Sequence, residues 1–124
     1  MKIVIQNTNG IFAISRKEMD MIIDILPANL KSCADTVVLC GRNLSEPEVT
    51  FYKKERLVEL NCAVERKTEE HTQRAIETFL IGLSIVESRK EIPKKISEKQ
   101  REEYRVKIAV MADRCLQAIS SHVT

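Results

Sequence analysis

Two arginines one helical turn apart are the residues of this chain best suited to chemistry by type and spacing. Arg101 and Arg105 occupy positions i and i+4 of a predicted helix, so their side chains share one face. Two neighbouring guanidinium groups match a phosphate or pyrophosphate. If Phe79 of the preceding predicted helix came near them, a base could stack on its ring while the arginines held the phosphates. The glutamates interleaved with these basic residues are equally typical of a solvated, salt-bridged surface that binds no ligand.

Motifs typical of catalytic and metal sites are absent from the sequence. The segment His71-Thr72-Gln73-Arg74-Ala75 lacks both the Glu and the second His of the zinc-protease motif H-E-x-x-H. The chain has three Gly and two His, and it contains neither a Gly-rich phosphate loop nor G-x-S-x-G. A Cys or Ser nucleophile also needs a neighbouring His. We therefore expect no catalytic residue, no metal and no cofactor, and we predict a protein that is not an enzyme.

Composition favours one ordinary globular domain over residues 1–124. Apolar residues make up 44% of the chain and charged residues 31%, which is typical of a folded protein with a real core. A net charge of +2 and an aromatic content of 4% argue against binding to a nucleic-acid polymer. No charged leader precedes an apolar run, and no apolar run approaches the ~18 residues that span a membrane. The four cysteines form no C-x-x-C pair, so we predict reduced core thiols in a cytoplasmic protein.

The first part of the chain shows hairpin and helix signals. Asn9-Gly10 separates two short apolar runs, and Asn-Gly is the strongest short hairpin signal, so residues 2–5 and 11–14 are predicted to pair. Ser15, with Glu18 three residues later, forms a capping box and predicts the start of a short helix.

Three more strands are predicted before residue 66. They cover residues 36–40, 49–52 and 57–64, and a turn at residues 53–56 joins the last two. In the last strand apolar residues alternate with Glu59 and Asn61, which predicts one buried face and one wet face.

Two long helices are predicted in the C-terminal half, one after Thr68 and one from Ser97 to about Ser120. Each is apolar on more than one face, with centres at residues 79–86 and 108–112. A surface helix of a monomer normally has one apolar stripe. We therefore predict a homodimer or a higher oligomer, in which neighbouring subunits cover the surplus.

The order of these elements predicts an α+β fold. We expect an antiparallel sheet of about five strands, with one short helix and two long C-terminal helices packed on it. Residues 1–66 would be mostly sheet with one helix, and residues 67–124 would form a helical hairpin.

This layout resembles phage-encoded anti-Thoeris proteins of the sponge type, which are small oligomers with an N-terminal sheet and two C-terminal helices. They sequester cyclic adenine-nucleotide signals of bacterial immune systems without cleaving them. The pocket of that family uses an Arg near the last strand, an aromatic residue on the first long helix and an Arg pair on the second. The matching residues here are Arg56, Phe79, Arg101 and Arg105. The chain departs from the family pattern at Ser88-Arg89, where an Asn is expected, and at Val106, where an acid is expected.

Two binding functions follow as hypotheses, and an enzyme with an unrecognised site is a third hypothesis. The first, which the resemblance implies, is a non-enzymatic, homo-oligomeric binding protein that sequesters an anionic small molecule such as a cyclic adenine nucleotide. Arg56, Phe79, Arg101 and Arg105 would form its ligand site. The alternative is an adaptor or inhibitor that docks on a partner protein through its C-terminal helices, which needs no small-molecule pocket.

Overall fold

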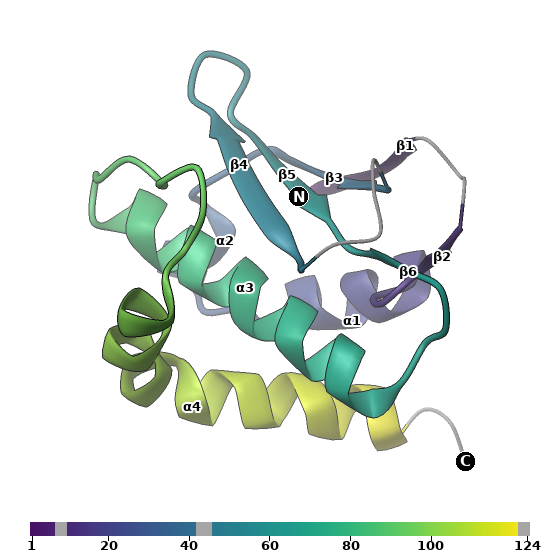
Figure 1. The fold of residues 1–124 in the computed structure, drawn as a ribbon. Coiled ribbons are helices and arrows are strands. Elements are labelled where there is room, and N and C mark those ends of the chain that lie inside the picture. The colour runs from purple at the N-terminus through teal and green to yellow at the C-terminus, as the bar shows by residue number, and fades with distance from the viewer. Residues whose placement is uncertain (7–9, 42–45, 122–124) are drawn as a thin grey trace.

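The computed structural model describes residues 1–6, 10–41 and 46–121, and it contains a sheet with helices on one face (Figure 1). The main sheet has the strand order β1 (Lys2–Gln6), β3 (Thr36–Cys40), β5 (Leu57–Asn61) and β4 (Glu48–Tyr52). A separate antiparallel pair consists of β2 (Ile11–Phe12) and β6 (Ala63–Val64). The helices are α1 (Arg16–Ile25), α2 (Ala28–Lys31), α3 (Glu69–Glu87) and α4 (Glu98–Ser121).

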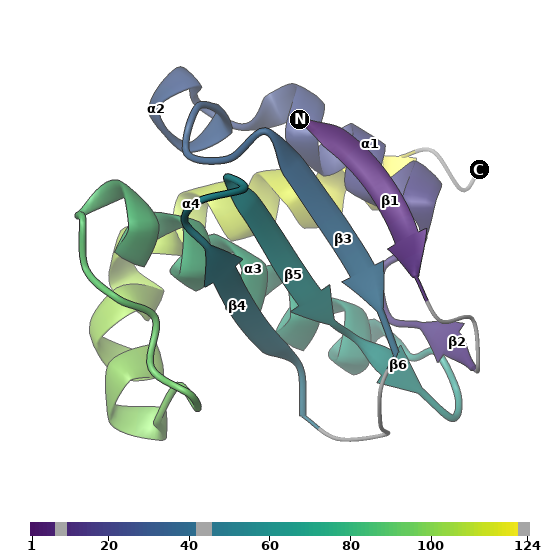
Figure 2. The same cartoon turned by 90° about the horizontal axis from the view of Figure 1, so that it is seen from above.

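The α+β class is confirmed, but the predicted sheet is wrong. The main sheet has four strands rather than five and is mixed: β1, β3 and β5 are parallel, and only β4 is antiparallel to its neighbour (Figure 2). One short helix was expected between the strands, whereas both α1 and the four-residue α2 are present.

The predicted N-terminal hairpin is also wrong. β1 pairs in parallel with β3, where Ile3 lies opposite Val37, and β2 pairs with β6 instead. The predicted turn residues 7–9 lie outside the described residues. The physical reason is the crossover: α1 and α2 lie between β1 and β3 in the chain and supply the long connection that parallel strands need.

The strand predicted over residues 57–64 is divided at Cys62 into β5 and β6. The Cys62 N–H donates to the carbonyl oxygen of Cys40 over 3.1 Å, and its carbonyl accepts from the N–H of Ala13 over 2.8 Å. The wet face expected at Glu59 and Asn61 was wrong, since each is only 8% exposed. These two residues belong to the inner strand β5, which is paired with β3 on one side and β4 on the other.

Predicted helix starts are confirmed by hydrogen bonds. At α1 the Ser15 N–H donates to a Glu18 carboxylate oxygen over 2.8 Å, and the Ser15 hydroxyl accepts from the Glu18 N–H over 3.1 Å. The Thr68 hydroxyl caps α3, and a second capping box between Ser97 and Gln100 begins α4. Local sequence therefore determines where each long helix begins.

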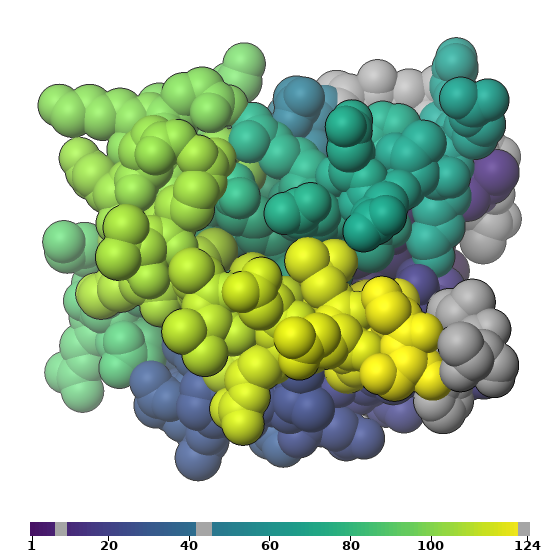
Figure 3. All heavy atoms as spheres, turned by 90° about the horizontal axis from the view of Figure 1, so that it is seen from below, coloured from purple at the N-terminus to yellow at the C-terminus, as the bar shows by residue number. Residues whose placement is uncertain are grey.

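Helix α3 lies between the sheet and α4, which runs across the face of α1 and α3 farthest from the sheet (Figures 1 and 3). The apolar residues of α3 are therefore buried within one chain, both on the side facing the sheet and on the side facing α4. They include Ile76, Phe79, Leu80, Ile81 and Leu83. The oligomer stays a prediction. Since one chain already covers the apolar faces of α3, only the exposed apolar residues of α4 still favour it. On α4, Val106 and Val110 are 85% and 73% exposed.

Gly82 allows α3 to approach β4 closely. A Cβ atom at this position would lie 2.7 Å from Cγ2 and 2.9 Å from Cγ1 of Val49. Those distances are too short for any real side chain, so the absence of a side chain at residue 82 sets the spacing between α3 and the edge strand β4. This contact positions the end of α3 beside that strand.

Candidate ligand-binding site

Arg101 and Arg105 lie side by side, as their spacing predicts, but both guanidinium groups bind Glu77 of α3. The Arg101 Nη1 lies 3.2 Å from Glu77 Oε1, and the Arg105 Nε lies 3.5 Å from Glu77 Oε2. Arg101 is only 2% exposed. Arg105 also pairs with Glu102, and the hydrogen bond that Arg105 donates to the Glu77 carboxylate raises the pKa of its guanidinium. The two arginines therefore hold α4 against α3 through one carboxylate.

Arg74 extends this ion-pair cluster towards β4. Its guanidinium donates to Glu98 over 2.5 Å and to Glu46 over 3.0 Å, and it lies 3.6 Å from Glu77. Its hydrogen bond to Glu98 lowers the pKa of that carboxyl. Burial lowers the pKa of Arg74, but its bonds to Glu98 and Glu46 outweigh burial and raise the pKa overall. All three arginines of the cluster are thus already paired with carboxylates of the same chain.

The other two predicted site residues lie apart from this cluster. Phe79 is 0% exposed and is packed in the core, so its ring offers no face for stacking in the single chain. Arg56 ends the turn between β4 and β5, which projects away from α4 in Figure 1. Its Nε pairs with Asp35 over 3.2 Å and its Nη2 donates to the carbonyl oxygen of Ser32 over 2.5 Å. The structure brings together Arg101 and Arg105, but neither Phe79 nor Arg56 with them.

Sequence reasoning missed Glu77 as the centre of the cluster. A signal was present, because Glu77 is the only acid between Glu70 and Glu87 and lies next to the apolar run at residues 79–86. A lone carboxylate on such a helix needs a partner cation. The Arg pair on the next helix supplies it.

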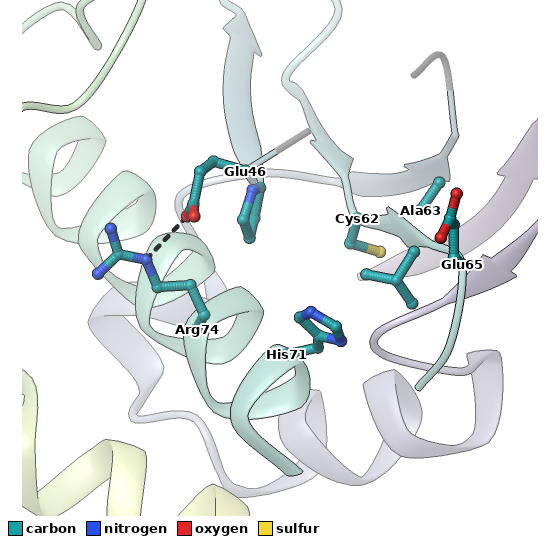
Figure 4. Close-up of a pocket in the computed structure, with 8 residues that line it drawn as sticks. Glu46, Cys62, Ala63, Glu65, His71 and Arg74 are labelled. Carbon is teal, nitrogen blue, oxygen red and sulfur yellow. Dashed lines mark hydrogen bonds and ion pairs between the residues drawn. The ribbon is translucent and has the colours of Figure 1, made fainter. Parts of the chain in front are cut away.

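Near the start of α3 is a hollow of about 510 Å³, the His71 hollow (Figure 4). Its lining residues are Glu46, Pro47, Cys62, Ala63, Val64, Glu65, His71 and Arg74. Figure 4 shows the Arg74–Glu46 pair at one side of it and Cys62 at the other. Arg74, the one arginine among the lining residues of this hollow, is therefore already paired with a carboxylate.

The His71 hollow combines a thiol and an imidazole, but the thiol is not activated. Cys62 is buried, and burial raises the pKa of its thiol to about 11, so the sulfur stays protonated at neutral pH. A nucleophilic Cys needs the opposite shift. The His71 Nδ1 lies 2.9 Å from the carbonyl oxygen of Arg66, which orients the ring in the first turn of α3. These two residues do not form a nucleophile and base as they stand.

A larger hollow of about 730 Å³ lies between the outer edge of β4 and the connection that follows α3. We call it the basic hollow. Its lining residues are Thr50, Phe51, Lys53, Val86, Arg89, Lys90, Glu91 and Ile92. Figure 2 shows that connection beside β4, at the edge of the sheet. The half-buried Phe51, Val86 and Ile92 supply an apolar surface, and exposed charged residues surround it.

The cations of the basic hollow differ from those of the Glu77 cluster because they are unpaired. Within the described residues, Lys53, Arg89 and Lys90 form no ion pair or side-chain hydrogen bond. β4 is an edge strand of its sheet, so backbone groups along its outer side are not used by another strand of that sheet. The basic hollow therefore has free donors for an anionic ligand.

The fold itself does not indicate another ligand crevice. The parallel strands follow one another across the sheet in one direction, so it lacks the reversal of strand order at which α/β proteins bind ligands. Among the described residues, no three His, Cys, Asp or Glu side chains gather to hold a metal ion. No helix in the described part of the chain has the length and apolar character to cross a membrane.

Comparison with known proteins gave no match. No protein family, curated protein or solved structure is significantly similar to this chain.

Proposed function

We propose that this chain binds a small anionic molecule in the basic hollow and holds it without cleaving it. The observation that carries the proposal is the set of three cations, Lys53, Arg89 and Lys90, that surround an apolar surface and have no carboxylate partner among the described residues. Pockets for small ligands typically combine an apolar lining with a few convergent polar groups.

This proposal keeps the expected class of ligand but moves its site. Arg101 is buried against Glu77 and Phe79 is in the core, so binding there would require the α3–α4 contact to open. At the basic hollow the positive charges are already exposed and Phe51 is half-buried beside them. The resemblance to sponge proteins makes adenine nucleotides, cyclic and linear, the first compounds to test, and a homo-oligomer remains part of the proposal.

The test compares charge reversals at matched positions. The double variant K53E/K90E reverses two cations of the hollow, and K54E/K99E reverses two exposed lysines that do not line it. Binding of adenosine monophosphate, cyclic adenosine monophosphate and pyrophosphate is measured by titration calorimetry and by the shift in Tm. We expect binding by the parent and by K54E/K99E, and its loss in K53E/K90E. A parent that binds none of these anions contradicts the proposal.

Arg105→Gln separates the two candidate sites. Because Arg105 belongs to the Glu77 cluster, this variant should bind like the parent if the basic hollow is the site. Loss of binding in a folded R105Q protein would return the site to the Arg pair. Recovery of intact ligand after denaturing a bound sample distinguishes a binding protein from an enzyme.

The alternative function is a protein-docking module, and it has its own candidate surface. Val106 and Val110 lie one turn apart on the solvent side of α4, where apolar side chains are available to a partner. This alternative predicts no binding heat with any of the small anions.

A further inference from the structure

We infer that the basic hollow selects a doubly charged phosphate monoester over a singly charged phosphate diester, with Arg89 as the residue that sets this preference. The inference rests on the proposed function and names its ligand class. Lys53, Arg89 and Lys90 contribute three positive charges to the lining, and Glu91 contributes one negative charge, which leaves a formal charge of +2. A ligand group of charge −2 neutralises this lining, whereas a diester leaves half of it uncompensated.

The helix that ends at the hollow does not reverse this balance. The carboxyl end of α3 carries a partial negative charge of about 0.5. It opposes an anion, but it is small beside the +2 of the side chains. It also gives Arg89 and Lys90 a structural use, since cations are favoured at this end of a helix. A test of ligand binding therefore needs a readout besides stability.

Arg89 adopts a backbone conformation in which glycine is the usual residue. Its φ is +60°, and it follows the last residues of α3 in the position where left-handed glycine commonly ends a helix. Its N–H donates to the carbonyl oxygen of Val86 over 2.9 Å, and the Lys90 N–H donates to that of Ile85 over 3.1 Å. These two bonds form the Schellman motif. The chain therefore keeps an arginine where glycine would satisfy the backbone without strain.

The chemistry of the three cations suits a monoester phosphate. A guanidinium donates two parallel hydrogen bonds to two phosphate oxygens, and lysine ammonium groups act as point charges. A monoester offers three terminal oxygens to the three cations, whereas a diester offers only two. Phe51, Val86 and Ile92 offer an apolar surface to the rest of the ligand. The ligand class is thus an organic phosphate monoester with an apolar or aromatic part, for which adenosine monophosphate is the probe.

The first experiment measures affinity against pH for two probes on the parent protein. The second pKa of a phosphate monoester is about 6, so its doubly charged fraction rises about fourfold between pH 5.5 and 7.5. We expect adenosine monophosphate to bind about fourfold more tightly over that interval. Cyclic adenosine monophosphate keeps one charge throughout, so it reports any change in the protein's own groups. Equal pH profiles for the two probes would overturn the inference.

The second experiment replaces Arg89 by Gly and by Lys. Arg89→Gly removes the cation and relieves the positive φ, so its Tm should not fall below that of the parent. We expect it to bind adenosine monophosphate at least tenfold more weakly and to lose the preference over the cyclic probe. Arg89→Lys keeps one charge without the fork and should fall between the two. An unchanged preference in Arg89→Gly would contradict the role of Arg89.

The two proposals fail in different ways. If the parent binds neither probe, the proposed function fails. If it binds both equally at every pH and K53E/K90E abolishes both, the basic hollow is an anion site and only the selectivity for a monoester is wrong.

Discussion

Replacing Glu77 by Ala tests whether the Arg101–Arg105 pair is a structural clamp or a ligand site. In the native protein one carboxylate accepts from Arg101 and Arg105, and the Arg101 side chain is only 3% exposed. Removing one partner of a buried ion pair leaves an uncompensated charge and typically costs about 3–5 kcal/mol. Arg105 is 41% exposed, so its share is below about 1 kcal/mol because water screens it. We expect E77A to lower the free energy of unfolding by about 3 kcal/mol, or roughly 10 °C in Tm.

Arg101→Met is the matched comparison because it removes the buried charge itself. Glu77 would keep Arg74 and Arg105 as partners at 3.6 and 3.5 Å. The substitution also eliminates the Arg101 Nε, which is buried and has no hydrogen-bond partner within the described residues. Replacing a buried charge by an apolar side chain of similar size is often neutral or stabilising. We expect R101M to change the free energy of unfolding by less than about 1 kcal/mol.

The double variant E77A/R101M completes the cycle. Because it strands no buried charge, it should be about 2 kcal/mol more stable than E77A alone. Urea unfolding followed by circular dichroism measures all four proteins, and a constant m-value confirms that the same surface unfolds. If E77A costs less than about 1 kcal/mol, or if R101M does not rescue it, Glu77 does not hold Arg101 and the structural interpretation is refuted.

Three further outcomes follow from the packing, the electrostatics and the thiols. Gly82→Ala gains about 1 kcal/mol in helix propensity but overpacks against Val49 at a cost of about 1–3 kcal/mol, so urea unfolding should show a net loss that V49A partly suppresses. Burial raises the pKa of Glu18, but its bonds to Lys67 and to a backbone N–H outweigh burial and lower it overall. The Glu18 carboxylate therefore stabilises the fold at pH values above its pKa in the unfolded chain. This contribution is lost as the pH falls through the lower pKa of Glu18 in the folded protein, so the stability difference between the parent and Glu18→Gln should shrink below about pH 4. Half-exposed Cys33 should react with a thiol reagent before the three buried cysteines, which should react only on unfolding, as mass spectrometry of the labelled protein can show.

Local signals predicted well where the helices begin, because an N-terminal cap depends on residues that are close in sequence. Ser15 with Glu18, Thr68, and Ser97 with Gln100 each satisfy backbone donors within three residues. Strand pairing could not be predicted in the same way. Asn9-Gly10 favours a hairpin locally, but β1 finds its partner in β3, more than thirty residues later. Alternation at residues 57–64 likewise says which side chains share a face, not whether neighbouring strands cover that face.

The candidate site shows the same division between local and distant information. The spacing of Arg101 and Arg105 correctly placed both on one helical face, but it could not reveal that Glu77 of another helix binds them. Lys53 and Arg89 are thirty-six residues apart in the sequence, so only the fold brings them to one hollow. Which cations remain without a carboxylate is a property of the whole structure and is not encoded in any short motif.

The central place of α3 has a consequence for synthesis of the protein. All strands of the main sheet precede this helix in the chain, and their inner face carries Val37, Leu39, Val58 and Leu60, which are buried only in the finished fold. On the ribosome these strands emerge before the helix that covers them. The apolar inner face of the sheet therefore stays exposed to other chains until α3, which ends at Glu87, has left the exit tunnel. Because transiently exposed apolar surface promotes aggregation, we expect the chain to depend on chaperones during translation until α3 covers the sheet.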